Sequence, residues 1–192
     1  MPRAKEFDEA EVLDKALELF RERGFKHTSF ADLTGSLGVN RQSLYDTYGD
    51  KHTLYQSALK RYSARSLDMV RRKLEEATPI RQVLASLIDG MIASNCDGGS
   101  PGCLMVNSMV ELSTHDADTR ALVQAHADEL DRLLSARLTL AQRKGEISKS
   151  KDPAAIARFL RHTMLGMSVA SRALGERAGL VESSRVALQV LD

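Results

Sequence analysis

Cysteine is scarce in this chain, and long apolar runs and a large excess of either charge are missing. Two cysteines among 192 residues do not make a disulfide framework. No stretch reaches the roughly 18 consecutive apolar residues of a membrane span, and the first residues carry no apolar signal segment. We therefore expect a cytoplasmic protein. A formal net charge of +1 argues against indiscriminate coating of DNA, so any DNA binding must depend on local charge.

Strand patterns are absent too, because no segment sustains an alternation of apolar and polar residues. The prolines fall at plausible helix boundaries, where proline is tolerated. The sequence predicts an all-α chain of about nine helices. Their expected ranges are 8–23, 29–37, 41–47, 50–77, a helix from 79, 103–113, 116–143, a helix from 153, and 183–191.

The segment from Thr28 to Tyr55 has the pattern of a helix-turn-helix followed at once by a long helix. Ser29 with Asp32 makes a capping-box-like start, and Phe30, Leu33 and Leu37 recur at helical spacing as one buried stripe. Gly38 suits the tight turn, because glycine accepts positive φ without a steric cost. Asn40 is a good cap for a second short helix.

That second helix directs polar side chains outward while Val39 and Leu44 turn inward. Arg and Gln suit base edges in the major groove, and Ser, Thr and Tyr suit phosphate oxygens. A helix-turn-helix places its second helix in that groove. The predicted DNA contacts are Thr28, Ser29, Asn40, Arg41, Gln42, Ser43, Tyr45, Thr47, Tyr48 and Lys51.

Basic residues become concentrated after this motif. Residues 1–50 contain seven Lys and Arg against ten Asp and Glu, whereas residues 51–75 contain seven against two. Lys51 begins this basic stretch at a helix N-terminus, where backbone N–H groups and the helix dipole favour phosphate.

The N-terminal pattern resembles the TetR family of transcriptional regulators. The resemblance lies in ALELFRERGFKHTSFADL (16–33), LGVNRQSLYDTYGDK (37–51) and the HTLY that follows. It implies a helix-turn-helix DNA-binding domain over residues 1–50 and a helical effector-binding and dimerisation domain over 51–192, connected by the helix 51–77. The implied function is a one-component regulator, usually a repressor, that binds a near-palindromic operator as a dimer and responds to a small-molecule or thiol-reactive effector.

One departure from the family concerns the end of the second helix. Asp46 and Thr47 stand where the family often has an aromatic residue and a histidine. An acidic side chain is unfavourable beside phosphates, so we expect Asp46 to point away from them or to accept from a cytosine amine. This departure bears on the operator sequence and leaves the DNA-binding role in place.

Methionines gather in the C-terminal part of the chain, and methionine packs adaptably around irregular ligands. A core filled with methionine would give the same pattern. Together with the resemblance to the TetR family, the methionines indicate an effector pocket. The predicted pocket residues are Met69, Met91, Cys103, Asn107, Glu111, Phe159, Met164 and Met167.

Cys103 follows Pro101 and Gly102 and is expected at the first turn of a helix, a position that favours the thiolate. Cys96 precedes it by seven residues. Some members of the TetR family sense electrophiles or oxidants through a cysteine in this region. The resemblance therefore makes Cys103 a candidate sensor and Cys96 a candidate resolving thiol. The alternative is that Cys103 is a small buried apolar side chain.

The last two helices resemble the dimer surface of the family. Gly166 and Ala170 would allow close helix approach, and Val186 and Val190 give the final helix an apolar edge that needs cover.

Two other classes of function fit less well. A helical di-iron enzyme needs Glu-x-x-His pairs, and none of the five histidines has Glu three residues before it. The scattered Cys and His residues do not suit zinc, and a Cys-dependent enzyme would need an electropositive site around Cys103. A helical adaptor without DNA binding leaves Arg41, Gln42 and Tyr45 unexplained. We expect no enzyme activity, no cofactor and no metal.

Overall fold

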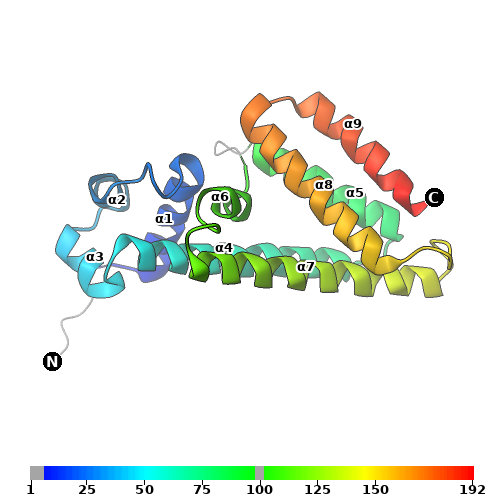
Figure 1. Ribbon diagram of the computed structural model, residues 1–192, viewed down its shortest axis with the longest axis horizontal. Helices are drawn as coiled ribbons and strands as arrows, with labels where there is room; N and C mark the ends of the chain where they lie inside the picture. Colours follow the sequence, from blue (N-terminus) through cyan, green and yellow to red (C-terminus); the bar gives the residue numbers. More distant parts are fainter. Residues whose placement is uncertain (1–6, 98–101) are drawn as a thin grey trace.

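The computed structural model describes residues 7–97 and 102–192, and its long axis runs from the N-terminal helices to the C-terminal ones (Figure 1). All regular structure in these ranges is helical. The elements are α1 (Glu9–Arg23), α2 (Phe30–Leu37), α3 (Arg41–Tyr48), α4 (Lys51–Leu74), α5 (Ile80–Cys96), α6 (Leu104–Glu111), α7 (Ala117–Arg143), α8 (Pro153–Leu174), α9 (Arg177–Leu188) and the short 3-10 helix η1 (Gln189–Leu191). None of the helices in these ranges combines the length and apolar character needed to cross a membrane.

The helix ends follow local chemistry. The predicted capping box is present: the Ser29 hydroxyl accepts from the backbone N–H of Asp32, whose carboxylate accepts from the backbone N–H of Ser29. Gly38 ends α2 in the left-handed conformation, with φ of 67°. Asp152 followed by Pro153 starts α8 as expected.

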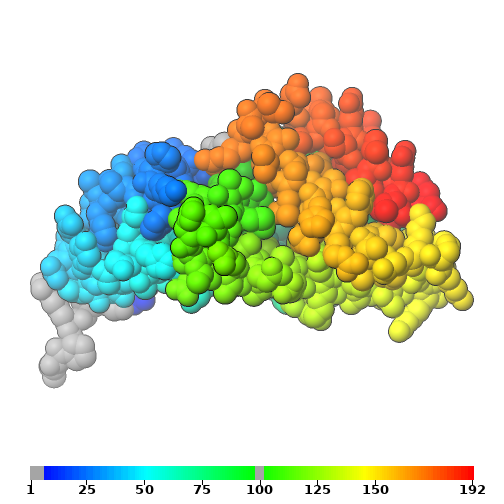
Figure 2. Space-filling model, viewed as in Figure 1, coloured from blue at the N-terminus to red at the C-terminus, as the bar shows by residue number. Residues whose placement is uncertain are grey.

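Two apolar cores lie along the molecule. The first joins α1, α2 and α3 to the start of α4 and to α6, with Phe20, Tyr55 and Leu104 fully buried. The second joins the end of α4 to α5, α7, α8 and α9, with Ile88, Leu138 and Leu160 fully buried. The 24-residue α4 and the 27-residue α7 run side by side between the two ends (Figure 1). Figure 2 shows α6, in green, wedged between the N-terminal helices and α8.

The last helix begins earlier than expected. The sequence predicts it over 183–191, but α9 begins at Arg177 and ends at Leu188. Leu180 is 5% exposed and belongs to the second core, so packing draws the preceding Gly179 into the first turn despite its low helix propensity. The following residues tighten into η1.

Candidate functional site

The exposed face of α3 is the candidate DNA-binding surface. Leu44 and Tyr48 turn into the first core, because they lie four residues apart on one side of the helix. Arg41, Gln42 and Tyr45 are therefore left on the outside. These three are among the ten residues that the sequence assigned to DNA contacts.

Three of the side chains on this surface hold one another in place. The rings of Phe30 and Tyr45 stack with centroids 4.6 Å apart and planes 11° apart, and the Arg41 guanidinium lies 5.5 Å and 5.4 Å from the two centroids. Phe30, expected in the buried stripe of α2, is only half-buried because it takes part in this stack. Gln42 donates to Asp46 at 2.7 Å, so Asp46 is occupied within its own helix.

The remaining residues at the helix starts act as caps or sit at the margin of the surface. Asn40 accepts from the backbone N–H of Ser43 at 2.8 Å, and Ser29 caps α2. Ser29 and Asn40 are exposed, whereas Ser43 and Thr47 are half-buried. All four lie at or near the ends of helices that an approaching phosphate backbone would meet.

Three predicted DNA contacts bind the two ends of α1: Thr28 and Lys51 hold the turn after it, and Tyr48 contacts its start. Thr28 is fully buried and donates to the carbonyl of Gly24 at 2.6 Å. Tyr48 is buried and donates to a main-chain carbonyl at the start of α1. The Lys51 ammonium donates to the carbonyls of Phe25 and Thr28, at 2.9 Å each, and lies 4.2 Å from the Phe25 ring centroid. These two carbonyls lie outside the helices, and they bind the Lys51 ammonium group that the sequence predicted to contact phosphate.

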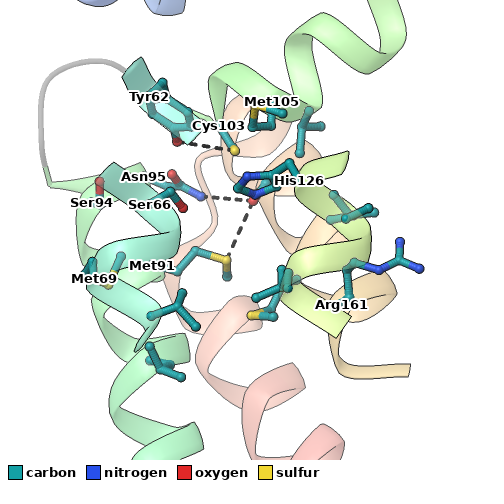
Figure 3. Close-up of a pocket in the computed structure, with 18 of the residues that line it drawn as sticks. Tyr62, Ser66, Met69, Met91, Ser94, Asn95, Cys103, Met105, His126 and Arg161 are labelled. Atoms are coloured by element: carbon teal, nitrogen blue, oxygen red, sulfur yellow. Dashed lines mark hydrogen bonds between the residues drawn. The ribbon is translucent and has the colours of Figure 1, made fainter. Parts of the chain in front are cut away.

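A cavity of about 180 Å³ lies between α4, α5, α6, α7 and α8 (Figure 3). Four of the eight predicted pocket residues line it: Met69, Met91, Cys103 and Met164. Met105 and Met109 of α6 line it as well, so five methionines from four helices surround the space. Such side chains can adapt to an irregular ligand.

The other four predicted pocket residues lie elsewhere. Asn107 donates to the carbonyl of Arg21, and Glu111 accepts from backbone N–H groups after α1. Phe159 is 45% exposed on the outer side of α8, and Met167 is buried in the second core. These four do not line this cavity, because helical spacing does not say which neighbouring helix a side chain meets.

Cys103 is the N-cap residue of α6 and lines the cavity. The Tyr62 hydroxyl donates to its Sγ at 3.3 Å. Burial of Tyr62, together with the nearby Cys103, raises the pKa of the phenol well above its usual range. Cys96 ends α5, and both cysteines are free and half-buried. Residues 98–101, which carry most of the predicted loop between them, lie outside the described residues.

The cavity also contains polar side chains that sequence reasoning missed. Asn95 donates to Ser168 at 3.3 Å, and Ser168 contacts the Met91 sulfur at 3.7 Å. Nδ1 of His126 pairs with the Ser63 hydroxyl at 2.9 Å. Burial lowers the pKa of His126, so its imidazole is neutral near pH 7. A lone His inside a helix carries no sequence signal for a pocket.

A polar bridge connects the cavity wall to the end of α1. Nε of the buried Arg21 donates to the carbonyl of Gly102 at 2.9 Å, and Nη2 donates to the carbonyl of Ser94 at 3.1 Å. Ser94 lines the cavity, and Gly102 directly precedes Cys103. From α8, Arg172 donates to the carbonyls of Arg21 and Glu22. The bridge thus joins α5, α6 and α8 to the helix that supports α2 and α3.

Glu111, at the end of α6, makes a second connection to the same turn. Its carboxylate accepts from the backbone N–H groups of Phe25 at 3.0 Å and Lys26 at 2.6 Å. Gly24 ends α1 with φ of 81°, and a Cβ there would lie 2.8 Å from Oε2 of Glu111. Only glycine therefore fits both the backbone conformation and the close approach of α6.

His52, Asp116 and Asp118 place potential metal-ligand atoms within 4.8 Å of one another. Asp116 is already engaged, because it contacts His52 at 2.7 Å and accepts from Gln56 and Thr119. Burial alone would raise the pKa of Asp116, but the hydrogen bonds from Thr119 and His52 hold it at about 2. The group is a polar contact between the start of α4 and the start of α7.

The outer face of α8 and α9 carries an apolar surface. Gly166 is exposed with open space around it, and Val186 is 65% exposed. Ala170 and Val190 pack partly against the second core. The other large exposed apolar side chains of α8 are Phe159, Val169 and Leu174.

Comparisons with known proteins find similar sequences and structures that cover both the N-terminal and the C-terminal parts of the chain. Residues 12–58 match the family model "Bacterial regulatory proteins, tetR family", and residues 78–187 match "Tetracyclin repressor-like, C-terminal domain". The chain is 32% identical to the uncharacterized HTH-type transcriptional regulator YezE of Bacillus subtilis over the full length of both chains. It is 31% identical to the HTH-type transcriptional repressor ComR of Escherichia coli, over 88% of this chain and 82% of ComR.

A similar solved structure is a cysteine mutant of the TetR family transcriptional regulator CifR complexed with 26-base-pair double-strand operator DNA. The TM-score is 0.87, with 26% sequence identity over 100% of both chains.

Proposed function

The chain belongs to the TetR family of transcriptional regulators, and from this premise we propose that it is a repressor that binds a near-palindromic operator as a homodimer. An effector in the cavity between α4 and α8 releases it. Family membership makes the protein a DNA-binding regulator and not an enzyme. We further propose that it acts in the cytoplasm, where a DNA-binding regulator meets its operator.

The observation that carries the proposal is the outer face of α3. Arg41, Gln42 and Tyr45 are exposed on one short helix whose other side is anchored in the core. The stack of Arg41 on Phe30 and Tyr45 orders these side chains before DNA arrives, which lowers the entropy cost of binding. Arg41 is placed to contact a guanine edge, and Tyr45 a phosphate.

Residues 1–50 form the DNA-binding domain in this proposal and residues 51–192 the effector-binding and dimerisation domain, with α4 connecting them. The separation of the two apolar cores supports this division. The first core also takes in Leu104 and Leu112 near the two ends of α6, so the two parts are mechanically connected.

The dimer forms through the apolar face of α8 and α9. Gly166 allows close approach of a partner helix, and the exposed Val169, Leu174 and Val186 gain cover. Twofold symmetry would present two copies of α3 about 34–36 Å apart, one turn of DNA. The two copies of α3 must contact both half-sites of the operator at the same time, so a small change in their spacing weakens operator binding.

Release follows from movement of the cavity wall. A ligand that shifts the end of α5 or the start of α6 also shifts the carbonyls that hold Arg21, and with them the support of α2 and α3. A coupling free energy of about 1–3 kcal/mol is enough for allosteric control of this kind.

A thiol-reactive effector is the second candidate trigger. Sγ of Cys103 lies on the cavity wall beside the Tyr62 hydroxyl, so alkylation of the thiol would place a bulky group inside the cavity and release a proton. Cys96 would be the resolving thiol if the trigger is an oxidant. Both triggers act on the same wall.

The experiment is fluorescence anisotropy with labelled DNA from upstream of the protein's own gene, over a range of salt concentrations. Arg41→Ala should weaken binding by roughly 5- to 150-fold, since a good bidentate base contact contributes about 1–3 kcal/mol. Tyr45→Ala should weaken it through the loss of a phosphate contact. Arg143→Ala, at the exposed end of α7, is the matched control. Equal affinity of Arg41→Ala and the control would refute the role of α3.

A further inference from the structure

The cavity has the size of one small ring. An apolar cavity of about 150 Å³ is known to hold benzene, so about 180 Å³ accommodates a ring with a small substituent. Its walls are largely apolar: five methionines are joined by Val123, Leu130 and Leu134. Met69 and Gly90 both line the cavity and are exposed to solvent, so the cavity reaches the surface beside α4 and α5.

Among the described residues, no unpaired charge faces this space. Arg161 is the one formally charged side chain among the residues that line the cavity, and its Nε donates to Asp131 at 2.8 Å with both side chains mostly buried. An ionic ligand would therefore lose its hydration without gaining a counter-ion, which is strongly unfavourable.

Few polar atoms of the described lining residues remain free to recognise a ligand; besides Nε2 of His126, they include the Ser66 hydroxyl and Oδ1 of Asn95. The Tyr62 hydroxyl donates to Cys103, and the Ser168 hydroxyl already contacts Asn95 and Met91. His126 uses Nδ1 for Ser63, and its Nε2 has no hydrogen-bond partner within the described part of the chain. Figure 3 shows the His126 ring facing Asn95 and Cys103 across the cavity.

We propose that the effector is an uncharged molecule of about six to ten heavy atoms, an apolar ring or short chain with one hydroxyl group that hydrogen-bonds Nε2 of His126. A hydroxyl can donate or accept, so it suits either tautomer that the contact with Ser63 imposes. The assignment rests on the proposed function only in taking this cavity as the effector site.

The test is isothermal titration calorimetry on the full chain with para-cresol, toluene, para-toluate and para-methylbenzylammonium, which share one ring size. We expect one para-cresol per chain, with toluene about tenfold weaker, because a hydrogen bond in an apolar site contributes about a factor of ten. The anion and the cation should bind at least tenfold more weakly than para-cresol. Equal binding of either ion, or of toluene, would overturn the proposal.

Variants assign the hydrogen bond to His126. His126→Phe keeps a ring in place and should weaken para-cresol about tenfold while leaving toluene within twofold. His126→Gln keeps a polar group and should restore part of the preference, even if the Phe variant folds poorly. His115→Phe, at an exposed position, is the control and should match the wild type. An unchanged preference for para-cresol in both His126 variants would refute the role of this residue.

Operator binding measured in parallel separates this inference from the proposed function. If para-cresol binds with the expected preference but the operator is not released, the ligand class is upheld and the effector role of the cavity fails. If para-cresol does not bind while a charged compound occupies the cavity and releases the operator, the ligand class is overturned and the regulator role is upheld.

Discussion

Removing the carboxylate of Glu111 should both destabilise the protein and weaken its response to effector. This side chain joins the end of α6 to the turn after α1, through hydrogen bonds from the backbone N–H groups of Phe25 and Lys26. Glu111→Ala leaves both N–H groups without an acceptor. The same change cuts one of the few polar contacts through which α6 holds the support of the DNA-binding helices.

The magnitude follows from the geometry. A hydrogen bond to a charged group contributes about 1.5–3 kcal/mol when buried, and solvent around the exposed Lys26 reduces that for one of the two bonds. We expect a loss of about 2 kcal/mol in the free energy of unfolding. For a chain of this size, that corresponds to a fall of roughly 4–8 °C in Tm.

The assay is a thermal scan at fixed protein concentration, followed by operator titrations with and without effector. Glu75→Ala is the control, because Glu75 is an exposed carboxylate at the end of α4. The Glu111 variant should have a lower Tm and a smaller difference between its two operator affinities. If both variants melt within a degree of the wild type, the stabilising role of Glu111 is refuted. If the effector response is unchanged, coupling through α6 is refuted.

Two further outcomes can be checked directly. The guanidinium groups of Arg61 and Arg65 hold the pKa of Asp14 at about 2, below its usual value of 3.8, so the stability it contributes is full above about pH 4 and is lost as the pH falls toward 2. Urea midpoints at about pH 6 and pH 3 should therefore differ less for Asp14→Asn than for the wild type, and equal differences would contradict the assignment. Cys103→Ser should abolish any release of operator by a thiol-reactive electrophile, and a response that persists would remove Cys103 as the sensor.

The order of the helices along the chain could be predicted from the sequence, because the signals that start and end a helix are local. A capping residue, a turn glycine and an apolar spacing of three or four residues each act within one or two turns of chain. Ser29 with Asp32, Gly38 and Asn40 therefore marked the helix-turn-helix correctly. The exposure of Arg41 and Tyr45 also followed from the face opposite Leu44.

Which side chains meet across helices was decided only by the tertiary structure. Lys51 binds carbonyls more than twenty residues away, and Glu111 binds N–H groups about 85 residues away. The same holds for His126, whose place in the cavity depends on how α4 to α8 pack. Helical periodicity states which face of a helix is buried, but the partner on that face depends on the crossing of helices that the chain brings together over long separations.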